Sequence, residues 1–198
     1  MIKDKQKRGV KKVEELRVDM RERTPEEQAM YDRQAQLMFK LNHTMPRTTE
    51  YMAVLKELFE DRLGEGSYVA SPISGAAMEK LVIGKNCFIN SNLLAMARGG
   101  ITIEDNVQVA ANVQLISNNH DPYDRQILTC KPVLIKEGAW IGAGATIMPG
   151  VTIGKHAIVG GASVVTHDVG DCEVVVGSPA KVIKTLDKDR FENDRDIL

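Results

Sequence analysis

The histidine with the most suggestive surroundings is His120, in the polar stretch SNNHDPYDRQ at residues 117–126. Imidazole in water titrates at about pH 6.5, so a neutral ring can take a proton from a hydroxyl near neutrality. General-base assistance of this kind accelerates a reaction by about 10²–10⁴-fold. A histidine in a polar stretch can equally be an ordinary surface residue, so its meaning depends on the elements around it.

Those elements repeat with a period of six residues on both sides of the polar stretch. A period of six fits neither a helix nor an alternating strand, and it is typical of a β-solenoid whose short strands each bury one aliphatic side chain. Burial of each such side chain contributes about 1.5–3 kcal/mol. The aliphatic positions are Ile83, Ile89, Ile103, Val109, Leu115, Ile135, Ile141, Ile147, Ile153, Val159 and Val165.

The repeat is interrupted twice. The interval from Ile89 to Ile103 is two residues longer than two repeats, with Gly99-Gly100 as the expected bulge. The interval from Leu115 to Ile135 is also two residues beyond a multiple of six, and the polar stretch lies inside it. Loops that project from a rigid scaffold often carry binding and catalytic residues. The second interruption therefore predicts a functional loop at residues 116–132 and favours a catalytic role for its histidine.

Two helices are expected before the repeat. The first begins with a capping box at Thr24 and Glu27 and ends near Asn42. The second begins at Thr48–Thr49 and ends at Gly64. Their buried faces are predicted to consist of Met30, Leu37, Met38 and Leu41 in the first helix and Val54, Leu55, Leu58 and Phe59 in the second. We therefore divide the chain into an N-terminal helical segment (1–68), a repeat domain (69–185) and a charged tail (186–198).

Composition excludes several classes of protein. The 198 residues carry a formal net charge of −1, so no strong field is available to recruit nucleic acid. The longest stretch without a charged residue, 141–154, is too short to cross a bilayer, and the basic N-terminus lacks the apolar core of a secretory signal. The three cysteines lack metal-ligand spacing and are expected to be buried thiols in a reducing cytoplasm.

Taken together, these features resemble the maltose and galactoside O-acetyltransferases, which are hexapeptide-repeat acyltransferases. The resemblance spans about residues 14–185 and rests on the motifs VDMRERTPEE, MFKLNHTMP, GKNCFINSN, SNNHDPYDR, AWIGAGATIMPGVTIG and VVVGSPAKVIK. It implies a left-handed parallel β-helix with a helical N-terminal segment and a protruding catalytic loop. It also implies acetyl transfer from acetyl-CoA to a sugar-like hydroxyl, without a metal, in a homotrimer with active sites between subunits.

The same resemblance suggests which residues form the site. His120 matches the general base, while Asp19, Asn90 and Leu128 match positions that bind or line the acceptor. The positions expected to contact acetyl-CoA are Trp140, Ala143, Gly161, Thr166, His167, Lys181 and Lys184. The two lysines would meet phosphates, and His167 stands where the family often has a lysine. Small residues at repeat corners and lysines in a solvated tail are the simpler alternatives.

Two positions depart from the family pattern. Ala76 stands where galactoside enzymes carry a serine, and Arg98 stands where they carry an aspartate. A guanidinium donates hydrogen bonds and cannot accept them. If Arg98 faces the acceptor, it should favour a carboxylate or phosphate there; if the Gly99-Gly100 bulge turns it outward, it has no such effect.

Three other functions fit the sequence less well. A xenobiotic acetyltransferase could use the same fold, but such enzymes generally lack the helical N-terminal segment. A non-catalytic scaffold would not need His120 or the two C-terminal lysines. A zinc carbonic-anhydrase-like solenoid needs three converging histidines, whereas His43 lies outside the repeat and His156 lies at a corner.

Overall fold

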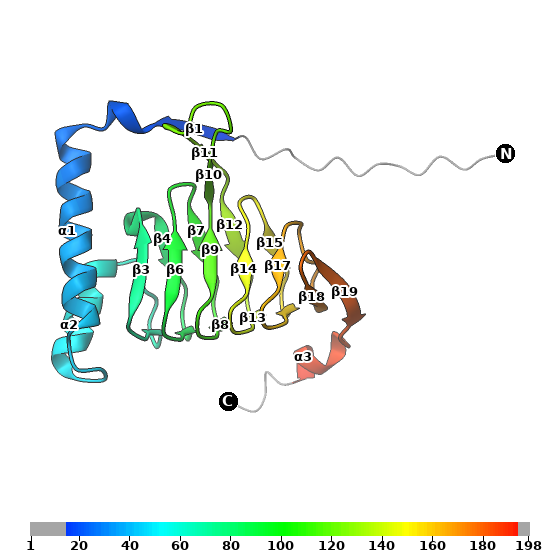
Figure 1. The fold of residues 1–198 in the computed structure, drawn as a ribbon. Helices are drawn as coiled ribbons and strands as arrows, with labels where there is room; N and C mark the ends of the chain where they lie inside the picture. Colours follow the sequence, from blue (N-terminus) through cyan, green and yellow to red (C-terminus); the bar gives the residue numbers. More distant parts are fainter. Residues whose placement is uncertain (1–14, 194–198) are drawn as a thin grey trace.

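The computed structural model describes residues 15–193, and a stack of β-coils forms its main body (Figure 1). The basic residues 1–14 and the end of the charged tail lie outside this range. Two helices flank the first coils, and a hairpin projects beyond one edge of the stack. The β-solenoid predicted from the six-residue period is confirmed.

The described part of the chain begins with an element that the sequence did not predict. Strand β1 (Leu16–Asp19) and the 3₁₀ turn η1 (Met20–Glu22) precede the first helix, α1 (Pro25–Asn42). The capping box is present as predicted: the Thr24 hydroxyl accepts from the Glu27 amide at 3.2 Å, and the Glu27 carboxylate accepts from the Thr24 amide at 3.1 Å. This cap fixes where α1 starts, directly after η1.

The second helix, α2 (Thr49–Phe59), starts where predicted but ends before Gly64, so that part of the prediction was wrong. Glu60 leaves the helical region with φ 55°, and Leu63 already forms a parallel bridge with Ile83. The chain has to be extended at Leu63 to enter the first coil, which ends the helix early. The predicted buried stripe of α2 is confirmed, since Val54, Leu55, Leu58 and Phe59 are at most 2 % exposed.

Three parallel sheets form the faces of the solenoid. Face 1 contains β4 (Leu81–Ile83), β7 (Ile101–Ile103), β12 (Val133–Ile135) and β15 (Thr152–Ile153). Face 2 contains β2 (Tyr68–Val69), β5 (Phe88–Ile89), β8 (Gln108–Val109), β13 (Trp140–Ile141), β16 (Ile158–Val159), β18 (Glu173–Gly177) and the antiparallel β19 (Ala180–Thr185). Face 3 contains β3 (Ile73–Ala76), β6 (Leu93–Met96), β9 (Gln114–Ile116), β14 (Thr146–Ile147) and β17 (Val164–Val165). The short elements η2 (Met78–Lys80) and α3 (Asp189–Asn193) complete the fold.

The aliphatic repeat forms the core of this stack. Every one of the eleven repeat positions is at most 1 % exposed, and the small residues Ala145, Ala157 and Ser163 that follow them are fully buried. Coils are close enough to require glycine at some corners: a Cβ on Gly142 would lie 2.6 Å from the Gly161 amide nitrogen. The repeat thus supplies a rigid frame with little freedom to adjust.

The predicted loop leaves the frame between β9 and β12. It contains β10 (Asn118–His120) and β11 (Ile127–Cys130), which pair antiparallel, and β1 adds a third strand on the other side of β11. Figure 1 shows this small sheet beyond the ends of the face 3 strands. In the part of the chain that the structure describes, no helix is both long and apolar enough to span a bilayer.

Candidate active site

His120 lies at the end of β10, exposed to solvent. Its Nδ1 atom lies 2.6 Å from the backbone oxygen of Arg125, on the other side of the loop turn. A carbonyl oxygen can only accept, so in the neutral ring Nδ1 carries the hydrogen and Nε2 carries the lone pair. The fold therefore presents a histidine whose tautomer and orientation suit a general base.

The next residue, Asp121, organises the turn. Its Oδ1 accepts from the amides of Tyr123 and Asp124 at 2.8 and 3.1 Å, and its Oδ2 accepts from Arg17 Nη2 at 2.5 Å. The hydrogen bond from Arg17, aided by the two amides, lowers the pKa of the Asp121 carboxyl to about 2. At neutral pH the Asp121 side chain is therefore a carboxylate, and it holds the turn that carries the Arg125 carbonyl.

A second arginine joins the loop to Asp19, which was predicted to bind the acceptor. Arg21 Nη2 donates to Asp19 Oδ2 at 2.6 Å and to Asp124 Oδ2 at 2.9 Å. Arg21 also donates to Asp19 Oδ1 through its backbone amide and its Nε atom. The side-chain hydrogen bonds from Arg21 lower the pKa of Asp19. Asp19 is therefore an ionised carboxylate beside the loop, and its oxygens can accept hydrogen bonds.

A cavity of about 220 Å³ lies between β1, the start of α1 and the loop. Asp19 and Leu128, two of the predicted acceptor residues, line it together. Arg98 lines the same cavity, with its side chain only 14 % exposed and its Nη2 atom 3.1 Å from Glu27 Oε1. Arg98 therefore points into this cavity, toward Glu27, and not out to solvent. The remaining lining residues are Arg17, Val18, Met20, Glu22, Arg23, Glu27 and Tyr31.

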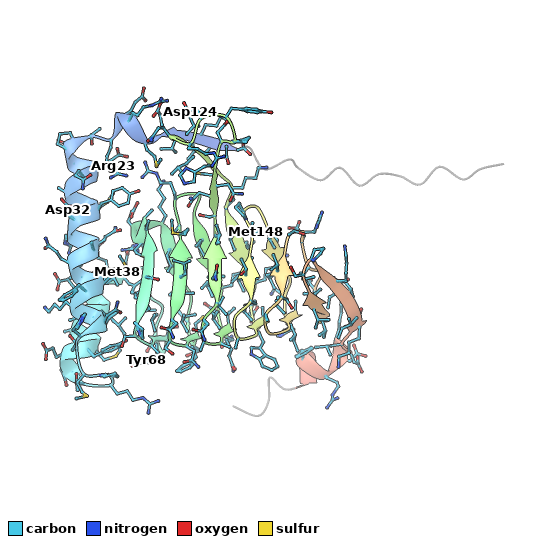
Figure 2. All side chains as sticks on the ribbon, viewed as in Figure 1. Arg23, Asp32, Met38, Tyr68, Asp124 and Met148 are labelled. Atoms are coloured by element: carbon cyan, nitrogen blue, oxygen red, sulfur yellow. The ribbon has the colours of Figure 1, made fainter. Side chains whose placement is uncertain are left out.

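Figure 2 shows where this region lies on the solenoid: Asp124 is in the hairpin, and Arg23 is at the junction between η1 and α1. Both are near the edge where face 3 turns into face 1, which we call the loop edge. Met148, just after β14, marks the same edge farther along the stack, toward the C-terminal coils. Thr166 and His167, just after β17, also lie at the loop edge, with Thr166 Oγ1 2.9 Å from His167 Nδ1.

Other predicted site residues occupy the corner where face 2 turns into face 3, which we call the far edge. Asn90 follows β5, Ala143 follows β13 and Gly161 follows β16. The Ala143 oxygen accepts from the Ala162 amide at 2.8 Å, so Ala143 and Gly161 are neighbours in adjacent coils. These residues are separated from His120 by the full width of face 3.

The remaining predicted cofactor residues lie on face 2. Trp140 is on β13 with 51 % of its surface exposed, and β19 carries Lys181 and Lys184 opposite Val176 and Val174. Within one chain the predicted cofactor residues therefore form no single cleft. They follow face 2 and both edges of face 3.

Four charged residues of this region were not predicted from the sequence: Arg17, Arg21, Asp121 and Asp124. Charged residues of both signs do occur in VDMRER and HDPYDR, but nothing in either motif identifies the other as its partner. The other two histidines outside the loop edge make ring contacts: His43 stacks on Phe39 at 4.1 Å and His156 on Phe191 at 4.3 Å. Within residues 15–193, no three His, Cys, Asp or Glu side chains are grouped as metal ligands.

Sequence comparison matches two repeat families. Residues 132–167 match "Bacterial transferase hexapeptide (six repeats)" and residues 80–116 match "Hexapeptide repeat of succinyl-transferase". A galactoside O-acetyltransferase of Escherichia coli (strain K12) is 34% identical over 187 residues, covering 91% of this chain and 87% of the relative.

Solved structures give the same result. The hexapeptide-repeat acetyltransferase VCA0836 of Vibrio cholerae, complexed with acetyl-CoA, superposes with a TM-score of 0.78 at 32% identity, covering 83% of this chain and 91% of that one. A galactoside acetyltransferase in complex with coenzyme A has a TM-score of 0.78 at 30% identity, covering 86% of this chain and 87% of that one. The resemblance inferred from the motifs is thereby confirmed.

Proposed function

Because the chain belongs to the hexapeptide-repeat galactoside and maltose O-acetyltransferase family, and is thus an acetyl-CoA-dependent acyltransferase, we propose that His120 is its general base and a sugar-like molecule its acceptor. The observation that carries this proposal is the hydrogen bond between His120 Nδ1 and the Arg125 oxygen. It leaves Nε2 with a lone pair, on a histidine that is exposed to solvent.

The reaction needs only one protein base. His120 Nε2 takes the proton of the acceptor hydroxyl as the hydroxyl oxygen attacks the thioester carbonyl carbon. When the tetrahedral intermediate collapses, the carbon–sulfur bond breaks and the leaving thiolate takes this proton from the imidazolium. The acetyl ester and free coenzyme A leave, and the histidine is again neutral. No acyl-enzyme is required.

The acceptor site of the proposal is the cavity lined by Asp19, Leu128 and Arg98. A carboxylate offers about four lone-pair positions. Arg21 uses three of them on Asp19, two at Oδ1 and one at Oδ2. One position on Oδ2 is left for a hydroxyl hydrogen of the acceptor, while Leu128 supplies an apolar wall.

The complete site is proposed to form between subunits of a homotrimer. Strands rise about 3.3 Å per residue, so β6 and its flanking corners separate the two edges of face 3 by roughly 15 Å. Within one chain, Asn90 therefore cannot reach a hydroxyl that contacts His120. A neighbouring subunit that places its far edge against the loop edge would bring both residues to one acceptor, and closed cyclic oligomers are a common solution.

The donor is proposed to lie in the same intersubunit groove. Ala143 and Gly161 would let a thin pantetheine chain approach the backbone at the far edge, and Thr166 and His167 would border it at the loop edge. Trp140 on face 2 and Lys181 and Lys184 on β19 would contact the rest of the coenzyme, the lysines as point charges for phosphate.

The free thiols fit a reducing compartment, so we include the cytoplasm in the proposal. Cys87, Cys130 and Cys172 are all buried and unpaired with one another. Burial raises the pKa of each thiol, which keeps it protonated and unreactive.

Co-expression of two inactive variants tests the shared site. His120→Ala and Asn90→Ala are each expected to lose most acetyl-CoA-dependent thiol release with sugar acceptors. If one site takes His120 from one subunit and Asn90 from the next, random mixing restores about a quarter of the wild-type sites. Light scattering on the same sample should give three chains per particle. Activity no higher than the sum of the two variants would contradict the intersubunit site.

The acceptor class is tested separately with the wild-type enzyme. Thiol release is followed with acetyl-CoA and a panel of neutral sugars, anionic sugars and aromatic amino or hydroxyl drugs. A sugar acceptor at least tenfold better than any drug supports the proposal. Preference for a drug would favour the xenobiotic alternative, and no transfer to any compound would favour the scaffold.

A further inference from the structure

We propose that β1, with Arg17 and Arg21, forms a clamp on the 116–132 loop, and that these two arginines are positioning residues for His120. The clamp is a property of the fold alone, whereas its positioning role rests on the proposed function of His120. Neither arginine needs to touch the acceptor or acetyl-CoA for this role.

The backbone of the clamp is the three-stranded sheet. β1 pairs antiparallel with β11 at four successive positions, from Leu16 opposite Cys130 to Asp19 opposite Ile127. The Met20 amide continues the contact by donating to the Gln126 oxygen at 2.9 Å. Because β11 is the partner strand of β10, β1 covers the open side of the hairpin that carries His120. A two-stranded hairpin is only marginally stable on its own, so a third strand matters here.

Arg17 acts on the turn of the hairpin. Its guanidinium binds Asp121 Oδ2, and the other oxygen of Asp121 holds the amides of Tyr123 and Asp124. The residue after this turn is Arg125, whose backbone oxygen orients His120. A short chain of hydrogen bonds therefore runs from Arg17 through Asp121 and the turn to the imidazole.

Arg21 acts on the other side of the turn. Asp124 Oδ2 accepts from Arg21, and Asp124 Oδ1 accepts from the Gln126 amide at 3.1 Å. The same guanidinium also holds Asp19, which lines the acceptor cavity. Arg21 therefore fixes the position of the Asp19 carboxylate relative to the loop. A cation that bound only Asp19 or only Asp124 would not link the two.

Single exposed ion pairs contribute little to stability, typically less than about 1 kcal/mol. The clamp differs because both arginines act on one short turn whose carboxylates also bind backbone amides. A misplacement of about 1 Å can cost roughly a hundredfold in rate at a reacting centre. Small losses of order in the turn should therefore be visible in kcat long before they affect the fold.

Hydrogen exchange of the loop amides tests the clamp without any substrate. Arg17→Gln should speed exchange of the Tyr123 and Asp124 amides about three- to tenfold, and Arg21→Gln should do the same for Gln126. Arg33→Gln is the matched control, because Arg33 is 54% exposed in its side chain and pairs with Glu60 at 3.2 Å, away from the loop. Unchanged loop exchange in both clamp variants would overturn the clamp.

Steady-state kinetics then tests the positioning role. Arg17→Gln and Arg21→Gln are expected to lower kcat about tenfold with little change in the KM for acetyl-CoA. Arg17→Lys should recover part of kcat, because lysine keeps the positive charge that pairs with Asp121, whereas glutamine keeps only N–H donors. Faster loop exchange with an unchanged kcat would overturn the positioning role. If the wild-type protein transfers no acetyl group to any acceptor, the proposed function fails, while the exchange data still decide whether the clamp exists.

Discussion

The solenoid and the 116–132 loop are held by opposite kinds of contact. In the solenoid, equivalent residues of neighbouring coils stack in register, as Ile141 does on Val109 and Val159. In the loop, the decisive contacts join residues that are far apart in the sequence. Arg17 binds Asp121, which is 104 positions away, and Arg21 binds Asp124, which is 103 positions away. The repeat provides a frame that tolerates few changes, whereas the loop needs a distant strand to give it a fixed shape.

The largest expected effect comes from His120→Ala. Loss of the base should lower kcat by about a hundredfold or more, because the described loop residues include no second imidazole. The far-ultraviolet circular dichroism and melting temperature should stay unchanged, since the side chain is exposed. Thiol release at saturating acetyl-CoA measures the effect. A variant that keeps more than a tenth of wild-type kcat would contradict the base assignment.

Ile141→Ala, in the solenoid, should have the opposite effect: it should lower stability and leave kcat unchanged. Ile141 is fully buried at the centre of the stack, and its truncation should lower the free energy of unfolding by about 2–4 kcal/mol. Under conditions where this variant is folded, its kcat should remain close to wild type, because no loop residue has moved. Chemical denaturation measures the free energy of unfolding. A large loss of kcat in the folded variant would show that the solenoid core and the loop do not contribute separately to stability and to catalysis.

Arg98→Gln should produce a smaller effect, on selectivity. Arg98 lines the proposed acceptor cavity but is partly neutralised by Glu27, so we expect only a three- to tenfold fall in the preference for anionic over neutral acceptors. The preference is measured as the ratio of kcat/KM for a sugar acid or sugar phosphate to that for the matching neutral sugar. Arg33→Gln serves as a surface control. Equal ratios in wild type and Arg98→Gln would show that Arg98 does not contribute to the selection of charged acceptors.

The smallest effect is a shift in the titration of Asp121. Its pKa is about 2 in the fold, below the ordinary carboxyl value of about 3.9. Since the folded pKa is the lower one, the stabilisation by this carboxylate is complete above the unfolded value and is lost as pH falls through about 2. Carboxyl-carbon NMR should show the midpoint rising toward the ordinary value in Arg17→Gln. An identical midpoint in both proteins would mean that Arg17 does not hold Asp121.

The sequence by itself determined the frame. A six-residue period that is interrupted only twice is typical of a solenoid in which each aliphatic residue is buried, so the solenoid, its core and the place of the loop could all be predicted. The capping box at Thr24 was equally predictable, because its residues lie within one helical turn. The end of α2 was not, since Leu63 is extended only because Ile83 is there to pair with it.

The tertiary structure alone decided how the site is built. Nothing in the sequence pairs Arg17 with Asp121 or Arg21 with Asp124, because many arginines and carboxylates are available and ion pairing is indifferent to sequence order. The inward direction of Arg98 and the separation of Asn90 from His120 across face 3 also depend on how the coils stack. Short-range periodicity specifies a repeating backbone, whereas contacts a hundred residues apart exist only once that backbone has folded.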